Sequence, residues 1–499
     1  MKKIKYIILS CAIATIISSC TKLESIEYST IDPGFFPKTE ADASALVTTC
    51  YLPFRSHWYG GIYSCAQGGI QVMGEMTTDV ADCQWGADPW QPAVRHNWTA
   101  DNWPVVGNFY QYYRDISKFT IAISRVSGVT FKDEAYKNRL IAEIRCAKGF
   151  MGYLLYDWFG PVPLATMEQL KDPLGDVQIP RLSDAEMVKF IETELIEAAK
   201  VLPYKYDSGD YGRFTKGTAN MLLLKLYMKE SRWQDAVNIA TELQKAEYGY
   251  GLMDRYADIF TLENEGNKEI IHASTANISN PTLWLAHVLP GGFPTTNPNI
   301  QKWNGYRMLW NFYDTYEKGD TRLETISAEY KSTSDGVVYN RENPGPNFKK
   351  GAIPVKVGED PASTGEASGV DWVVFRYADV LLTKAEALVR LNKSVSQESI
   401  DLLNQIRTRV KLAPYNTAEV GTPEQFLEKM LIERGHELYF EGSRRTDLIR
   451  YGKYIEYARK KAEYLGYPSS TQEWFTRMPI PQSAINEGKG KVTQNIGYN

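Results

Sequence analysis

The chain has 499 residues, 43% hydrophobic and 23% charged, which is an ordinary globular composition and enough material for one large core or a few interlocked domains. The formal net charge of −4 excludes the basic footprint of a nucleic-acid-binding protein. Aromatic residues make up 12% of the chain, and 32 of them are tyrosines and 12 are tryptophans. Part of this set builds the core, but so many Tyr and Trp side chains also suit surfaces that stack on flat ligands.

The first twenty residues predict the location of the protein. Three lysines at positions 2, 3 and 5 precede an apolar run over residues 6–17, which is too short for a membrane span and is typical of a secretory signal. The run ends in Ile17-Ser18-Ser19-Cys20, the pattern of a lipobox. We therefore expect a signal peptide over residues 1–19, acylation of Cys20, and a membrane tether over residues 20–40. The alternative is a signal peptide cleaved elsewhere or a buried N-terminal helix.

Four more cysteines follow, Cys50, Cys65, Cys83 and Cys146. An even number in an exported protein permits disulfides, and Cys65–Cys83 is a candidate pair. The cysteine spacings match no zinc pattern, and no histidine pair stands at a zinc-binding spacing. We expect no metal and no cofactor.

The predicted elements alternate between helices and long loops. Thr39 caps a helix from about residue 41 to 53, with Asp42 in its first turn. Residues 55–104 and 247–371 are rich in Gly, Trp, Pro and Asn and lack helical periodicity, so we expect long loops there. Between and after them, helical periodicity covers about 105–246 and 372–455.

The helical segments are short and paired. In residues 139–159, apolar positions recur at three- and four-residue steps, and Gly160-Pro161 ends the run. Ser183 and Glu186 form a capping box that opens the next helix. Further helices are predicted at 215–229, 233–246, 372–391, 397–410 and 423–441. Such antiparallel pairs resemble tetratricopeptide hairpins, so the expected fold is mainly α: helical hairpins (about 41–54, 105–246 and 372–455) packed with a loop-rich half.

Several motifs occur in a fixed order along the chain. They are Phe36-Pro37-Lys38-Thr39-Glu40-Ala41, Trp158-Phe159-Gly160-Pro161-Val162-Pro163-Leu164, Gly212-Arg213-Phe214-Thr215-Lys216-Gly217, Phe375-Arg376-Tyr377-Ala378-Asp379, Glu433-Arg434-Gly435-His436-Glu437-Leu438-Tyr439-Phe440-Glu441-Gly442 and Met478-Pro479-Ile480-Pro481-Gln482. With them, residues 41–499 resemble the SusD/RagB family of outer-membrane nutrient-binding lipoproteins. The resemblance implies a cell-surface protein that binds oligosaccharides, or in some members peptides, without catalysis. It also implies a partner, a SusC-like TonB-dependent outer-membrane barrel on which the lipoprotein sits as a lid.

Two aromatic clusters in the loop-rich segments are the candidate ligand-binding residues. Sugar rings stack on Trp and Tyr through their C–H faces, while Asn, Asp and Arg side chains hydrogen-bond the hydroxyls. The first cluster comprises Trp85, Asp88, Trp90, His96, Asn97 and Trp98, and the second comprises Trp284, Trp303, Asn304, Tyr306 and Arg307. The alternative for each tryptophan is that it only packs a loop against the helices.

A block of charges near the C-terminus has two interpretations. It comprises Glu433, Arg434, Glu437, Glu441, Arg444, Arg445 and Asp447. Two carboxylates one helical turn apart could act on a glycoside, but interleaved apolar residues and arginine forks favour a structural ion-pair network. No GxSxG elbow and no GxxxxGK phosphate loop occurs, so we expect no enzyme. The alternatives are a glycoside hydrolase using Asp79 and Asp82, and a protein that binds peptides or proteins in a groove of the repeat-like helices.

Overall fold

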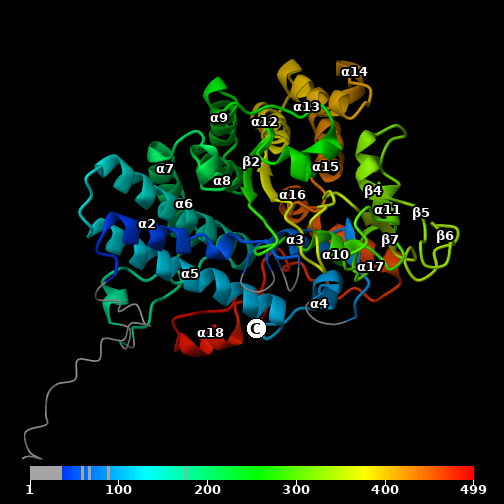
Figure 1. The fold of residues 1–499 in the computed structure, drawn as a ribbon. Coiled ribbons are helices and arrows are strands. Elements are labelled where there is room, and N and C mark those ends of the chain that lie inside the picture. Colours follow the sequence, from blue (N-terminus) through cyan, green and yellow to red (C-terminus); the bar gives the residue numbers. More distant parts are fainter. Residues whose placement is uncertain are drawn as a thin grey trace, which may run out of the picture.

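The structure is a computed structural model that describes residues 36–57, 61–65, 69–86, 90–172, 175 and 177–498. The predicted signal peptide, Cys20 and most of the predicted tether lie outside these residues. Figure 1 shows helices throughout the molecule, with short strands and loops concentrated on one side, so the mainly α fold class is confirmed. In the described part of the chain, no helix has both the length and the apolar character that a membrane crossing needs.

Seventeen α-helices lie within the described residues. They are α2 (Glu40–Thr49), α3 (Ile70–Met76), α4 (Trp90–Arg95), α5 (Trp103–Ser127), α6 (Glu134–Phe159), α7 (Asp184–Val201), α8 (Lys216–Lys229), α9 (Trp233–Leu243), α10 (Trp284–Val288), α11 (Trp310–Tyr313), α12 (Tyr377–Asn392), α13 (Gln397–Arg409), α14 (Thr417–Val420), α15 (Pro423–Glu437), α16 (Arg444–Arg450), α17 (Tyr454–Leu465) and α18 (Gln482–Glu487). The predicted capping boxes at Thr39 and Ser183 are both present.

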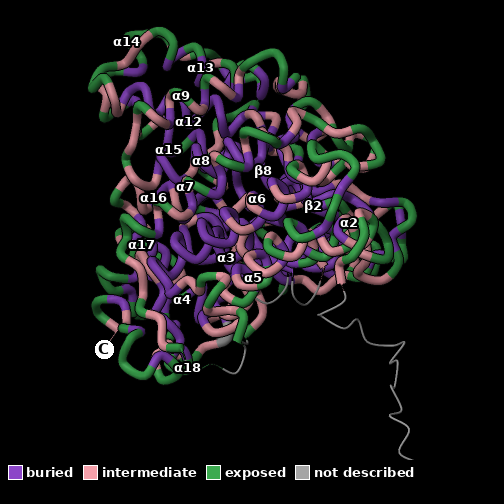
Figure 2. The backbone as a smooth tube through the Cα atoms, turned by 90° about the vertical axis from the view of Figure 1, so that its left-hand side faces the viewer, coloured by how far each residue is buried: buried purple, intermediate pink, exposed green. Residues whose placement is uncertain are grey.

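The helical half is a row of neighbouring helices. α5 packs on α6, α6 on α7, α7 on α8, α8 on α9 and α9 on α12, and α12 in turn contacts α13 and α15. Close approach of α6 and α7 requires small residues, because a Cβ added at Gly149 would come within 2.8 Å of the Leu195 side chain. Figure 2 shows the buried backbone concentrated along α6, α8 and β8 and the exposed backbone in the outer loops.

Eight short strands make up the sheets of the described residues. A four-stranded antiparallel sheet has the order β1 (Ala81–Cys83), β3 (Tyr306–Leu309), β7 (Gly351–Pro354) and β4 (Ile326–Ser327). Two separate pairs are β2 (Ile270–Ser274) with β8 (Trp372–Arg376) and β5 (Tyr330–Lys331) with β6 (Val338–Tyr339). The four-stranded sheet therefore joins the two segments that the sequence predicted to be loops.

Three sequence-based predictions need correction. The helix predicted from residue 372 begins at Tyr377, because residues 372–376 pair with β2; a short apolar run does not distinguish strand from helix. The first predicted loop segment contains α3, β1 and α4. The possible Cys65–Cys83 disulfide is not formed, since all four described cysteines are free and buried, each within the hydrophobic core.

The predicted ion-pair block is confirmed as a buried network. Glu437 at the end of α15 accepts hydrogen bonds from Arg376 and Arg409, and it forms an ion pair of 3.2 Å with Arg322. All four side chains are at most 4% exposed. Burial alone would raise the pKa of Glu437, but Arg409, Arg376 and Arg322 together hold it below its ordinary value.

A second group of ion pairs continues the network around α16. Arg434 pairs with Asp447 at 2.9 Å and with Asp379 at 2.9 Å, and Arg450 pairs with Glu386 at 2.7 Å. Arginine forks suit these sites because one guanidinium can bind two carboxylates in fixed directions. The network therefore ties α12, α15 and α16 together.

Removing the central carboxylate is expected to destabilise the whole fold. Glu437→Gln would leave Arg376 and Arg409 buried without their central carboxylate, so the free energy of unfolding is expected to fall by about 3 to 5 kcal/mol. Glu428→Gln, at a largely exposed position of the same helix, is the matched control and should change stability by less than about 1 kcal/mol. Urea unfolding followed by circular dichroism measures both; equal stabilities of the two variants would contradict the role given to Glu437.

The network also predicts a loss of stability in acid. Although burial alone would raise it, the pKa of Glu386 is lowered to about 2, from an ordinary value of 4.5, by Arg450, Arg390 and Arg434. Because the unfolded chain binds this proton more readily than the folded one, stability is present above the unfolded pKa and is lost as the pH falls from about 4.5 through about 2. The midpoint of unfolding should be highest at pH 7, lower at pH 4 and lowest at pH 3. In Glu386→Gln the midpoint should decrease less steeply with falling pH. A midpoint independent of pH over this range would contradict the prediction.

Candidate functional site

The two predicted aromatic clusters meet because β1 pairs with β3. Their register places Ala81 opposite Met308 and Cys83 opposite Tyr306, and the backbone N–H of Gln84 donates to the Gly305 carbonyl at 2.9 Å. Residues that follow β1 therefore lie against residues that precede β3. This brings Trp85 next to Trp303, although they are 218 positions apart.

Five rings form one aromatic group, called the tryptophan cluster below: Trp85, Trp90, His287, Trp303 and Tyr306. Trp85 contacts Trp90 edge to face at 4.7 Å between centroids, and His287 contacts Trp303 in the same manner at 4.9 Å. Tyr306 stacks on His287 at 5.6 Å. Tyr306 and His287 are buried, whereas the three tryptophans are only partly covered. The cluster thus has a packed base and a partly exposed tryptophan edge.

Hydrogen bonds fix the orientation of the indoles. The Trp85 Nε1–H donates to the Trp303 carbonyl at 3.0 Å, and the Trp90 Nε1–H donates to the Tyr306 hydroxyl at 2.9 Å. Two glutamines lie alongside, since Gln91 donates to the Trp85 carbonyl at 2.7 Å and Gln84 donates to Asn304 Oδ1 at 3.3 Å. The N–H groups of Trp85 and Trp90 are therefore engaged inside the protein, and the remaining exposed area of these two residues is apolar ring surface.

Arg307 holds the base of this site. Its guanidinium donates to the carbonyls of Val288 and Asn347, each at 2.8 Å, and to Asn304 Oδ1. Burial lowers the pKa of Arg307 to about 9. Through these hydrogen bonds Arg307 connects three segments of the loop-rich half. Because it is fully buried, it has no surface for a ligand.

His287 keeps the cluster uncharged at its centre. Burial lowers the pKa of His287 to about 4, and one ring nitrogen lies 2.8 Å from the Leu283 carbonyl. The imidazole is therefore neutral at physiological pH. His287 is not among the residues predicted from sequence, and its position three residues after Trp284 is the only signal that could have identified it.

Four predicted ligand contacts are buried in the structure, and their assignment as direct contacts is corrected here. Trp284, Tyr306 and Arg307 are at most 1% exposed, and Trp98 is 4% exposed. Trp284 donates to the Pro354 carbonyl at 2.9 Å, and Trp98 donates to the Tyr498 hydroxyl at 3.0 Å. They pack the loops, as the alternative for single tryptophans anticipated.

The remaining predicted residues separate into two places. Trp85, Trp90, Trp303 and the half-buried Asn304 belong to the tryptophan cluster, and Asn304 donates to Asn347 at 3.0 Å. His96, exposed Asn97 and Trp98 lie elsewhere: the His96 ring packs on Trp98 and on Tyr454 near the C-terminal segment. Asp88 lies outside the described residues.

Both carboxylates of the hydrolase alternative form ion pairs with basic side chains. Asp79 forms a fork with Arg444, at 2.7 and 2.9 Å, and buried Asp82 pairs with Lys350 at 2.9 Å. Within the described residues, no group of three His, Cys, Asp or Glu side chains is arranged to hold a metal ion. These carboxylates therefore serve as ion-pair partners and offer no free acid–base pair.

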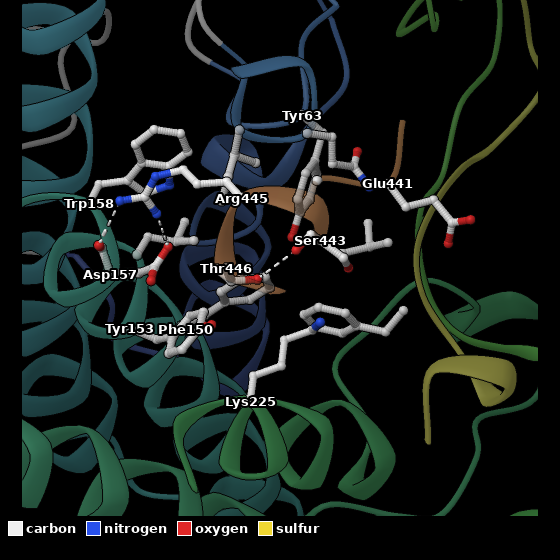
Figure 3. Close-up of a pocket in the computed structure, with 16 residues that line it drawn as sticks. Tyr63, Phe150, Tyr153, Asp157, Trp158, Lys225, Glu441, Ser443, Arg445 and Thr446 are labelled. Carbon is white, nitrogen blue, oxygen red and sulfur yellow. Dashed lines mark hydrogen bonds and ion pairs between the residues drawn. The ribbon is translucent and has the colours of Figure 1, made fainter. Parts of the chain in front are cut away.

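A cavity between α6, α8 and α16 also brings aromatic and charged groups together (Figure 3). Its volume is about 60 Å³, which is room for about four water molecules and too little for a sugar ring. Arg445 stacks on Trp158 and donates to Asp157 at 2.8 Å, and Lys225 donates to Asp379 at 2.8 Å. The cavity is therefore lined in part by the ion-pair framework.

Comparisons with known proteins give the same family at both ends of the chain. A model of the SusD family matches residues 301–498, and a model described as starch-binding and associating with the outer membrane matches residues 38–228. The starch-binding protein SusD of Bacteroides thetaiotaomicron is 23% identical over 77% of each chain.

Solved structures share the fold. A laminarin-binding SusD-like protein matches with a TM-score of 0.75 and 22% identity, covering 92% of this chain and all of the other. Surface glycan-binding protein A of Bacteroides thetaiotaomicron, solved with laminarihexaose, has a TM-score of 0.74 and 20% identity, with 92% and 100% coverage.

Replacing Arg307 is expected to loosen the base of the tryptophan cluster. Arg307→Met would leave the buried carbonyls of Val288 and Asn347 without a donor, at a cost of about 3 kcal/mol in unfolding free energy. Arg459→Met, on α17 and paired with Glu473 where both side chains are exposed, is the control and should cost less than about 1 kcal/mol. Chemical unfolding measures stability, and near-ultraviolet circular dichroism reports the tryptophan environment. A native tryptophan signal and native stability in Arg307→Met would contradict this role.

Proposed function

Because the chain belongs to the SusD family, we propose that it captures a neutral oligosaccharide at the cell surface and delivers it to a TonB-dependent outer-membrane barrel. The lipid on Cys20 would hold it at the outer membrane. Relatives named for starch and for laminarin support a glucose-based glycan as the ligand class. The protein would bind this ligand without cleaving it, which agrees with the pairing of Asp79 and Asp82 to cations.

One observation carries the proposal: three partly exposed indole rings, from two segments far apart in sequence, share a rigid base. Trp85, Trp90 and Trp303 are oriented before a ligand arrives, so stacking a sugar on them costs little conformational entropy. The half-buried Gln84 side chain lies next to the rings, where sugar hydroxyls need hydrogen-bond partners, whereas both amide atoms of Asn304 are engaged by Gln84, Arg307 and Asn347.

The charge of the cluster favours an uncharged ligand. His287 is neutral because burial lowers its pKa to about 4, and the guanidinium of Arg307 is covered and bound to carbonyls. An anionic sugar would find no exposed cation within the cluster itself. Neutral hexose units match both the ring faces and the Gln84 amide.

Tryptophan substitutions test the site directly. The chain from residue 21 onward would be titrated with maltoheptaose and laminarihexaose by calorimetry, as wild type, Trp90→Ala and Trp303→Ala. Loss of a stacking ring at the centre of a site costs about 2 kcal/mol, so each variant is expected to bind at least tenfold more weakly. Trp474→Ala, which removes a tryptophan of similar exposure outside the cluster, should bind as wild type.

Each outcome is informative. Tenfold weaker binding in both cluster variants, with no release of reducing ends, supports capture at this site. Wild-type affinity in both cluster variants would reject the site, and release of reducing ends by wild type would reject a binding-only function. If the protein bound peptides from a panel but neither oligosaccharide, the proposed function would change to peptide uptake.

A further inference from the structure

A cleft on the helical half has the features of a second ligand site. It lies between the segment 203–215 that links α7 to α8, the turn at 248–250, and β2, and its volume is about 280 Å³. Five tyrosines line it, Tyr204, Tyr206, Tyr211, Tyr248 and Tyr250. β2 lies well apart from α4, which carries Trp90, in both Figure 1 and Figure 2. The tyrosine cleft is therefore separate from the tryptophan cluster.

The tyrosine rings hold one another in place. Tyr248 stacks on Tyr250 at 5.5 Å with an interplanar angle of 25°, and Tyr204 packs edge-on against Tyr248 at 4.8 Å. The Tyr248 hydroxyl accepts from Asn220 at 2.7 Å, and the Tyr206 hydroxyl donates to Glu143 at 3.2 Å. Rings ordered in this way offer stacking area at low entropic cost.

The floor of the cleft contains an unsatisfied polar atom. His272 on β2 is 5% exposed, and its Nε2 has no hydrogen-bond partner among the described residues. Burial lowers the pKa of His272 to about 3, so the ring is neutral. The ring also packs on Phe214 at 5.1 Å between centroids, so His272 gives the cleft a firm, uncharged floor.

The rim is open and polar. Gly249 is exposed, and a Cβ placed there would meet no atom within 4 Å. Arg213 is paired with Glu143 at 2.9 Å and with Asp210 at 2.8 Å, so its charge is neutralised. Exposed Lys268 lies 3.8 Å from Asp254, and exposed Lys205 also stands at the edge as a hydrogen-bond donor. These polar groups can hydrogen-bond the hydroxyls of a polyhydroxylated ligand.

We propose that the tyrosine cleft is a second carbohydrate-binding site that takes one or two pyranose rings of a neutral glycan. The chemistry is stacking on the half-buried Tyr204 and Tyr250 and the exposed Tyr211, above the floor that His272 keeps uncharged. The inference rests on the proposed function, since it assumes that glycans are the ligands of this chain. Two separated contacts on one polysaccharide would raise the avidity above that of either site alone.

Variants that remove one site at a time test this inference. Maltoheptaose and laminarihexaose are titrated into wild type, into Trp90→Ala/Trp303→Ala, and into Tyr204→Ala/Tyr211→Ala. The tryptophan variant should keep weak binding, and adding the two tyrosine substitutions should reduce it at least fivefold further. Tyr204→Phe/Tyr211→Phe keeps the rings and should bind as its parent. Tyr464→Ala, at an exposed position elsewhere, is the matched control.

The outcomes separate this inference from the proposed function. Binding lost in the tryptophan variant and unchanged in the tyrosine variant would overturn the cleft and leave the proposed function standing. The reverse pattern would support the cleft and reject the tryptophan cluster as the site. Binding of neither oligosaccharide would reject both proposals for glucose-based glycans. The tripeptide Ala-Tyr-Ala is the peptide probe. If it binds to wild type and the tyrosine substitutions abolish that binding, the carbohydrate assignment of the cleft is overturned.

Hydrogen exchange on wild type gives a test that needs no variant. With 10 mM laminarihexaose or maltoheptaose, amides in 204–213 and 246–251 should exchange more slowly, because a ligand in the cleft restrains both segments. Protection confined to residues 84–91 and 303–305 would overturn the second site, even if the alanine variants failed to fold.

Discussion

The buried carboxylate of Glu437 is the interaction on which the rest of the architecture depends. It ends α15 and is shared by arginines from three other segments, Arg322, Arg376 and Arg409. Arg376 also binds Glu269 and Glu441, so β8, the residue before β2 and the segment after α15 are fixed together. A charge cluster of this kind tolerates little displacement, because each guanidinium must stay paired in a low-dielectric interior.

The same network positions the loop-rich half. Lys356, two residues after β7, donates to the Tyr439 carbonyl at 2.7 Å and to Glu441 at 2.5 Å. β7 pairs with β3, and β3 pairs with β1. The position of Trp85 beside Trp303 is therefore connected, strand by strand, to the charges at the end of α15. This gives the partly exposed indoles a rigid support, although Trp85 and Trp303 stand on loops and Trp90 on the short helix α4.

The two aromatic sites are built on different principles. The tryptophan cluster depends on pairing between distant strands, and Arg307 holds its base by binding carbonyls. The tyrosine cleft lies among neighbouring segments of the helical half, and its rings are ordered by contacts with one another. Both contain a buried neutral histidine, His287 and His272, so both combine stacking faces with an uncharged polar group.

The sequence by itself determined the features that depend on near neighbours. Capping boxes at Thr39 and Ser183, the long helix that ends before Gly160 and the role of the charged block around Glu437 all follow from local spacing. Only the tertiary structure decided that 372–376 is a strand and that Trp284 and Tyr306 are buried while Trp85, Trp90 and Trp303 keep exposed area. The reason is that the burial of these aromatics depends on strand pairing that brings together residues as far apart as Trp85 and Trp303, 218 positions apart. Local periodicity does not encode the register of that pairing.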